Sequence, residues 1–113
     1  MDLHHLADLL AQQSTAGRAH LEFLRSGSLS VGLYVLRVGD VDRQLPHRED
    51  EIYVVMAGQS RFSAGDEVRD VNPGDTIFVA AGVPHHFHDI VDELHLLVVF
   101  APPETPPADA PAG

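Results

Sequence analysis

The sequence alternates between short apolar runs and tight turns, and this punctuation constrains its fold more than any other feature. The runs are rich in Val, Ile, Leu and aromatic residues, which is typical of β-strands. They span residues 19–25, 29–38, 52–57, 61–63, 68–71, 76–80, 85–90 and 94–101. The turn signals between the later runs are residues 58–59, 64–66, 72–75 and 81–84. Many short strands at this spacing predict an all-β sandwich or barrel.

Two of the runs are apolar on both faces. Residues 52–56 and 96–100 do not alternate between apolar and polar side chains, as a strand with one wet face does. Both faces of these strands must therefore be covered, one of them by the barrel interior. The N-terminal segment covers part of the other face. We expect a second copy of the chain to cover the rest, which predicts a homodimer.

The two ends of the chain differ from its middle. A helix is predicted over residues 2–12, with Asp2 as its cap and with four leucines on one face: Leu3, Leu6, Leu9 and Leu10. Residues 102–113 hold five prolines and are predicted to form a disordered tail. The chain thus divides into a helix and lead-in over 1–18, one β-barrel domain over 19–101, and this tail.

Charge and missing residue types exclude several classes of function. The formal net charge is −10, there is no cysteine, and all seven basic residues are arginine. Without a basic footprint, we expect no binding to nucleic acid or to an anionic membrane. The missing thiols exclude disulfides and thiolate metal sites, and the missing lysine excludes Schiff-base chemistry. No apolar run approaches the roughly 20 residues that span a bilayer, and the N-terminus lacks the basic start of a secretory signal, so we predict a cytoplasmic protein.

Eight histidines in so short a chain make a metal site the first hypothesis to consider. His47 follows Pro46 and Glu51 opens a strand after a polar turn, so the two side chains can converge on one point. His85 opens another strand directly after the turn at 82–84. Two imidazoles and one carboxylate form a facial triad that suits non-haem Fe(II), and also Mn, Ni or Zn. A histidine and a glutamate near a turn are more often plain surface residues, so this pattern alone does not decide between the two.

Residues 39–89 resemble the cupin superfamily in two motifs. The first motif, G-x(5)-H-x-H-x(3,4)-E-x(6)-G, is matched in register by Gly39, His47, Glu51 and Gly58. The second, G-x(5)-P-x-G-x(2)-H-x(3)-N, is matched by Gly74, Gly82 and His85. Three positions depart from the motifs: Leu45 replaces the first histidine, Ala80 the proline and Asp89 the asparagine. The resemblance implies an antiparallel jelly-roll barrel, here preceded by a short helix.

The resemblance also implies one divalent transition metal, Fe, Mn, Ni or Zn. By position, His47, Glu51 and His85 carry over as ligands, whereas Leu45 cannot bind metal. The implied function is a metal-dependent enzyme, dioxygenase-like or isomerase- or lyase-like, that acts on a small organic molecule, with no catalytic residue assigned. The alternative is a metal-free barrel that binds a small molecule or a sugar without catalysis, and Leu45 favours it.

Other side chains near the expected site are assigned by strand alternation. Gln44 or Asp42 is a conceivable oxygen ligand, but alternation aims Gln44 away from His47. Alternation also places His86 and His88 on the face opposite the site. The side chains expected to line the pocket are Leu45, Tyr53, Phe87 and Asp89, of which the two aromatic ones also fit plain barrel core.

Overall fold

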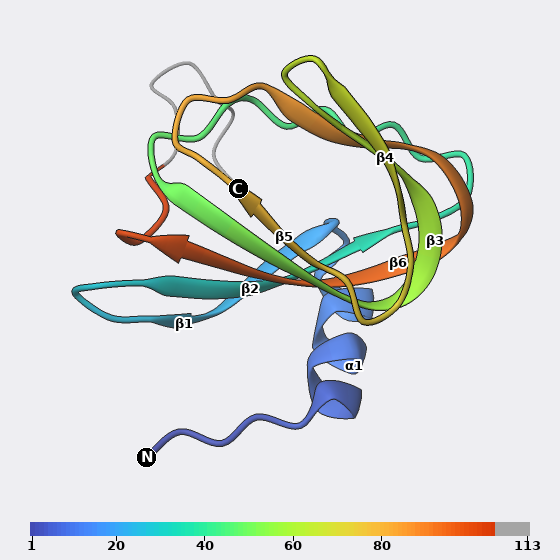
Figure 1. Ribbon diagram of the computed structural model, residues 1–113. Coiled ribbons are helices and arrows are strands. Elements are labelled where there is room, and N and C mark those ends of the chain that lie inside the picture. Colours follow the sequence, from blue (N-terminus) through green and yellow to red (C-terminus); the bar gives the residue numbers. More distant parts are fainter. Residues whose placement is uncertain (106–113) are drawn as a thin grey trace.

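The computed structural model describes residues 1–105. It contains α1 (Leu6–Ala16), β1 (His20–Arg25), β2 (Ser30–Leu36), β3 (Asp50–Ala64), β4 (Glu67–Val71), β5 (Thr76–Val79) and β6 (His85–Ala101). All strand pairs are antiparallel, in the order β1-β2-β6-β3-β4, with β5 paired to β3. Figure 1 shows the strands curled around a common interior, with α1 outside the sheet. The predicted antiparallel jelly-roll with a short N-terminal helix is confirmed.

The strands β3 and β6 are longer than the sequence suggested. The predicted runs 52–57 and 61–63 belong to one strand, and so do the runs 85–90 and 94–101. The prediction of a turn at 58–59 was therefore wrong. Gly58 has φ 93°, and a Cβ there would collide with the carbonyl oxygen of Glu93 in β6. A glycine at this point lets the paired strands shift register and bend without separating.

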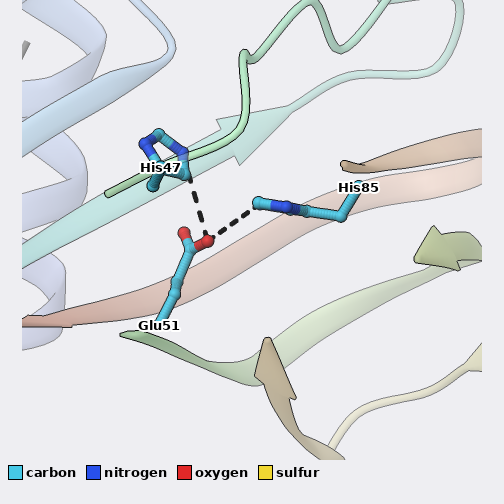
Figure 2. A group of neighbouring side chains, drawn as sticks. All are labelled: His47, Glu51 and His85. Carbon is cyan, nitrogen blue, oxygen red and sulfur yellow. Dashed lines mark ion pairs between the residues drawn. The ribbon is translucent and has the colours of Figure 1, made fainter. Parts of the chain in front are cut away.

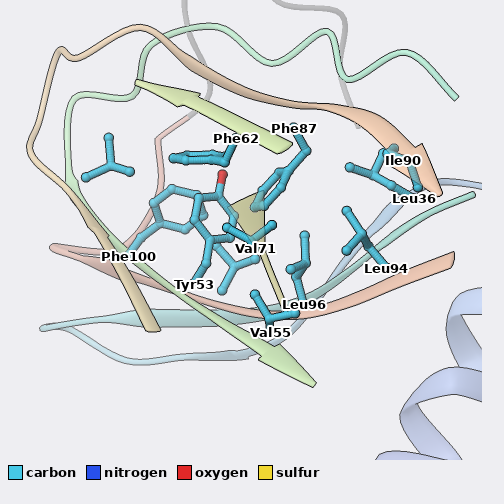
Figure 3. Packing of buried hydrophobic residues seen from close by; sticks show 12 residues of the cluster. Leu36, Tyr53, Val55, Phe62, Val71, Phe87, Ile90, Leu94, Leu96 and Phe100 are labelled. Carbon is cyan, nitrogen blue, oxygen red and sulfur yellow. The ribbon is translucent and has the colours of Figure 1, made fainter. Parts of the chain in front are cut away.

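The barrel core lies between the curved strands. Along β3 burial alternates, so that Tyr53 and Val55 point inward while Ile52 points outward. Twelve buried apolar side chains form this core (Figure 3): Leu36, Tyr53, Val55, Phe62, Val71, Val79, Phe87, Ile90, Leu94, Leu96, Val98 and Phe100. Burial of each large apolar side chain stabilises the fold by about 1.5–3 kcal/mol, so this cluster fixes the frame on which the site is built.

A second, smaller cluster joins the helix to the outside of the sheet. Leu9 of α1 packs with Leu33 and Val35 of β2. The helix begins four residues later than predicted, and His5 is its N-cap residue, with no side-chain cap bond. The prediction from Asp2 failed because Leu3 is 75% exposed and has no apolar surface to cover. The helix ends at Ala16, and its C-cap residue Gly17 has a φ of 73°, in the left-handed region that glycine adopts readily.

The beginning of the proline-rich segment contacts the barrel. Residues 102–105 lie within the described part of the chain, whereas the rest of the predicted tail, 106–113, lies outside the described residues. The backbone N–H of Glu104 donates to Ser30 Oγ at 2.9 Å, and Thr105 donates to the Glu49 carboxylate. Within the described residues, no helix has the length and apolar character needed to cross a membrane.

Candidate metal centre

Two side chains that are close in sequence, His47 and Glu51, meet a third from a distant part of the chain, His85. His47 lies in the irregular segment before β3, Glu51 is the second residue of β3, and His85 is the first residue of β6. One potential ligand atom from each lies within 4.8 Å of the others. The Glu51 Oε1 atom is 2.8 Å from His85 Nε2 and 4.0 Å from His47 Nε2 (Figure 2). The structure therefore brings together the three residues that the sequence had singled out.

Backbone hydrogen bonds bring the two histidine-bearing segments together. The N–H of Gly82 donates to the carbonyl of His47 at 2.7 Å, and the N–H of Ala81 donates to Asp50 Oδ1 at 3.0 Å. Gly82 has φ 81°, a conformation that glycine adopts at little cost. The turn that leads into His85 is thus attached to the segment that carries His47, and this attachment sets their separation.

The buried Glu51 carboxylate lacks hydrogen-bond donors among the described residues. Its side chain is 1% exposed, and among residues 1–105 no donor reaches either oxygen with the geometry of a hydrogen bond. The 2.8 Å contact with His85 Nε2 is short, but it lacks the angles of a hydrogen bond. A buried carboxylate needs charge pairing and hydrogen bonds or a metal. Two imidazole nitrogens and a carboxylate oxygen suit Zn, Fe, Mn or Ni, so the residues present fit a divalent transition metal.

His85 is held in a defined orientation. Its Nδ1 atom lies 2.8 Å from the carbonyl oxygen of Val83, so Nδ1 carries the proton and Nε2 faces Glu51. Burial lowers the pKa of His85, but the contacts with the Glu51 carboxylate and the Val83 carbonyl outweigh it and raise the pKa overall. The His85 imidazole therefore holds a second proton more readily than a free imidazole does. A metal that binds at Nε2 must displace that proton.

His47 has the opposite electrostatic balance. Burial is the largest influence and lowers its pKa, although the Glu51 carboxylate opposes the shift. Its Nε2 atom lies 3.1 Å from Gln44 Oε1, which can only accept, so Nε2 donates here. His47 is therefore a neutral imidazole, the form that binds metal once the Nε2 proton has moved.

The structure corrects the predictions for Gln44 and Leu45. Gln44 points into the site, with Oε1 3.1 Å from His47 Nε2 and 2.8 Å from Tyr53 Oη, whereas Leu45 is 51% exposed. The prediction assumed strand alternation, but no strand is formed between residues 40 and 49. Asp42 fixes the amide instead, because its Oδ2 accepts from Gln44 Nε2 at 2.7 Å and leaves Oε1 facing the centre.

Asp42 is not a ligand in this arrangement but a buried anchor. It is 7% exposed and accepts from Tyr34 Oη at 2.6 Å and from the backbone N–H of Phe87 at 2.9 Å. It therefore ties the irregular segment to both β2 and β6. The sequence analysis considered Asp42 as a possible ligand, and the structure gives it a positioning role.

The remaining predicted pocket residues divide into one that lines the site and two that do not. Tyr53 lines the cavity, and its Oη is 3.2 Å from His85 Nε2. Burial raises the pKa of Tyr53, so its hydroxyl stays protonated. Phe87 is 1% exposed and packs against Tyr53 within the core. The prediction for Asp89 was wrong, because its φ of 50° turns it out of regular strand geometry and its exposed side chain pairs with His88.

A cavity of about 120 Å³ adjoins the three residues. Its lining comprises His20, Tyr34, Gln44, His47, Glu51, Tyr53, Val98, Phe100 and Glu104. Five of these were missed from the sequence: His20, Tyr34, Val98, Phe100 and Glu104. The hairpin register pairs His20 with Tyr34, but this pairing depends on a register shift between Glu22 and Leu24 that the sequence did not indicate. Nothing in the sequence indicated Glu104, because it lies among prolines.

Three of the missed residues carry shifted pKa values, and burial raises that of Tyr34. Burial lowers the pKa of His20, whose Nε2 atom is buried without a hydrogen-bond partner among the described residues. Burial raises the pKa of Glu104 to about 7, and the neighbouring carboxylates of Glu49 and Glu51 act in the same direction. The Glu104 Oε2 atom lies 3.5 Å from His47 Nδ1. The cavity wall thus holds a neutral imidazole and a carboxyl group that is easily protonated.

Comparison with known proteins decides the family. A cupin-domain family profile matches residues 32–101. The protein is a cupin. This cupin is 43% identical over 105 residues to an uncharacterized protein of Streptomyces coelicolor, and the alignment spans 93% of this chain and 100% of that protein.

Solved structures share the fold of this cupin. TT1209 from Thermus thermophilus matches with a TM-score of 0.69 and 24% identity, over 91% of this chain and 99% of that one. An RmlC-like cupin with a double-stranded β-helix fold from Methanocaldococcus jannaschii matches with a TM-score of 0.66 and 16% identity, over 74% and 78% of the two chains. At these identities the likeness concerns the fold alone.

Proposed function

We propose that this cupin binds one divalent transition metal through His47, Glu51 and His85 and acts as a metal-dependent enzyme on a small organic molecule. The observation that carries the proposal is the Glu51 carboxylate, which is buried, faces two imidazole nitrogens and lacks hydrogen-bond donors among the described residues. Without a cation, such a carboxylate costs free energy of folding.

The cavity beside these residues supports a role in binding a small molecule. Its volume of about 120 Å³ is below the roughly 300–1,000 Å³ of pockets for drug-sized ligands, so it suits a small ligand or one end of a larger one. Val98 and Phe100 form apolar wall that excludes water, while the Tyr53 hydroxyl and the Gln44 amide offer polar contacts for orientation. A divalent transition metal would supply Lewis-acid or redox chemistry at this point.

The reaction class stays at two candidates, a dioxygenase-like reaction and an isomerase- or lyase-like one. Both need a metal with three protein ligands and open coordination positions, and the three residues here provide that number. The fold does not select between the two classes. Exposure of the metal-loaded protein to O₂, followed by measurement of O₂ consumption with candidate substrates, separates them.

A metal-free barrel that binds a small molecule or a sugar is the alternative function. The observation that favours it is Leu45, which occupies the position of the first motif histidine and points to solvent. The cavity would then bind its ligand through the same aromatic and polar wall, with the Glu51–His85 pair as a structural ion pair.

Metal content per chain tests the proposal. We expect about one equivalent in protein that is purified without added metal and dialysed against a weak chelator. Glu51→Gln removes the central carboxylate charge and should reduce the content to near zero. Glu67→Gln, on the exposed strand β4, is the matched control and should keep the wild-type content. Wild-type protein that holds no metal, and gains none from added Zn or Fe(II), would contradict the proposal. The metal-free barrel that binds a small molecule would then be the better account of the function.

We also propose that the protein is a homodimer in the cytoplasm. Ile52 of β3 and Phe78 of β5 are register partners on the outer face and are 39% and 63% exposed. A second copy packed on this face would cover both side chains. Light scattering at micromolar concentration should give twice the mass of one chain, and Phe78→Asp should shift the mass to that of a monomer. A wild-type mass of one chain would contradict the dimer.

A further inference from the structure

The segment 102–105 contributes Glu104 to the cavity wall and is held there by specific contacts. The Glu104 backbone N–H donates to Ser30 Oγ at 2.9 Å, and Arg25 Nη2 donates to the Glu104 carbonyl oxygen at 2.6 Å. Ser30 is itself 1% exposed. Both backbone polar groups of Glu104 are thus satisfied by the strands β1 and β2.

A buried carboxylate fixes the next residue of this segment. Glu49 is 3% exposed, and its two oxygens accept from the backbone N–H of Thr105 at 3.2 Å and from the Thr105 hydroxyl at 2.9 Å. A buried carboxylate that loses such donors pays a desolvation cost of about 1–3 kcal/mol or more. The docking of Thr105 on Glu49 therefore holds Glu104 at a defined place.

The Glu104 side chain faces the outer nitrogen of a candidate ligand. Its Oε2 atom lies 3.5 Å from His47 Nδ1, and the Glu104 side chain is 24% exposed. His47 Nδ1 is buried and has no hydrogen-bond partner among the described residues. Because a charge-assisted hydrogen bond is about 2.7–2.9 Å long, a side-chain movement of about 0.7 Å closes this contact.

Metal binding creates the need for such an acceptor. In the metal-free protein, His47 Nε2 donates its proton to Gln44 Oε1 at 3.1 Å. A metal bound at Nε2 would leave the imidazole proton on Nδ1, and ligating histidines almost always donate this second N–H to a carboxylate, a carbonyl or water. His85 already has its acceptor in the Val83 carbonyl at 2.8 Å. His47 has Glu104 in the corresponding place.

We propose that Glu104 is a positioning residue of the metal centre, which accepts the Nδ1–H of His47 and so fixes the ring with Nε2 toward the metal. This inference rests on the proposed metal site of His47, Glu51 and His85. It makes the segment Pro102–Thr105 part of the centre, because the docking of Thr105 on Glu49 determines where the Glu104 carboxylate lies.

Titration of the metal-free protein with Co(II) tests this role. Wild-type protein should bind about one equivalent, and Glu104→Ala should weaken binding by about 10–100-fold, the usual cost of losing such a partner. Glu104→Gln keeps a carbonyl oxygen as acceptor and should recover part of the loss. Glu67→Ala, an exposed glutamate on β4, is the matched control and should bind within twofold of wild type.

Proton NMR of the Co(II) protein gives a readout that general destabilisation does not reproduce. Wild type should show two strongly shifted, slowly exchanging imidazole N–H signals, one from His47 and one from His85. In Glu104→Ala and not in Glu67→Ala, one of the two should be lost to exchange with solvent. Unchanged affinity and two retained signals in Glu104→Ala would overturn the role of Glu104 and leave the metal site standing. A wild type that binds no Co(II) would overturn the metal site itself, and this inference with it.

Discussion

His47 and His85 face the same carboxylate, yet the chain positions them by different means. His85 opens the regular strand β6, whose alternation sends His85 and Phe87 inward and leaves His86 exposed. His47 lies in a segment without strand pairing, and its surroundings are set by side-chain hydrogen bonds that lead back to Asp42. Where a strand exists, the alternation of its side chains correctly predicts which residues point inward. Where hydrogen bonds to the buried Asp42 carboxylate replace the strand, alternation does not apply and the prediction fails.

The largest expected effect concerns His85, the ligand that the strand β6 positions. His85→Ala removes one of three proposed ligands, so the affinity for the metal should fall by at least about 100-fold. The metal content per chain after dialysis should fall with it. His86→Ala is the matched control, because His86 is the exposed neighbour on the other face, and its content should equal wild type. Equal metal loss in both variants would show that alternation does not order this end of β6.

The next largest effect concerns the anchor of the irregular segment. Asp42→Ala leaves the Tyr34 hydroxyl and the Phe87 N–H without their acceptor, and the free energy of unfolding should fall by about 2–4 kcal/mol. Asp40 is two residues away, is exposed and accepts only from the Arg37 N–H among the described residues. Asp40→Ala should cost under about 1 kcal/mol. Urea unfolding measures both free energies, and similar losses in the two variants would contradict the role of Asp42 as the anchor of the irregular segment.

A smaller effect compares the adjacent residues Gln44 and Leu45. Gln44→Leu removes the amide oxygen that accepts the Nε2 proton of His47 in the metal-free protein. Because this hydrogen bond competes with a metal at Nε2, Co(II) affinity should rise by up to about tenfold, one step of 1.4 kcal/mol. Leu45→Ala and Leu45→His should both stay within about twofold of wild type, because this side chain is 51% exposed. Tighter binding by Leu45→His would mean that position 45 faces the metal after all.

The smallest expected effect is a pH dependence near His47. The pKa of Glu104 rises from 4.5 to about 7 on folding, so the folded protein binds this proton more tightly than the unfolded chain. The stability that it contributes is present below pH 4.5 and is lost as the pH rises through about 7. The melting temperature of metal-free wild type should therefore fall between about pH 5 and pH 8 by more than that of Glu104→Gln. Equal falls would assign the dependence to other groups, such as His85, whose pKa is raised too.

Turn residues and apolar runs are local patterns, and they indicated an all-β sandwich or barrel. The resemblance to the two cupin motifs implied the jelly-roll and singled out His47, Glu51 and His85. The bend at Gly58 was mistaken for a turn, since only the pairing of β3 with β6 shows that the strand continues. Glu104 was missed for a similar reason, because its position depends on Ser30, 74 residues away along the chain.

Asp42 also limits how the cavity can be redesigned. One carboxylate serves a hydroxyl on β2, an amide on the pocket wall and a backbone N–H of β6. A library that varies every residue near the cavity would mostly sample chains that differ in folding and not in ligand preference. A library with Asp42 and the core residues Val98 and Phe100 held constant, and with variation confined to His20, would separate the choice of ligand from the integrity of the barrel.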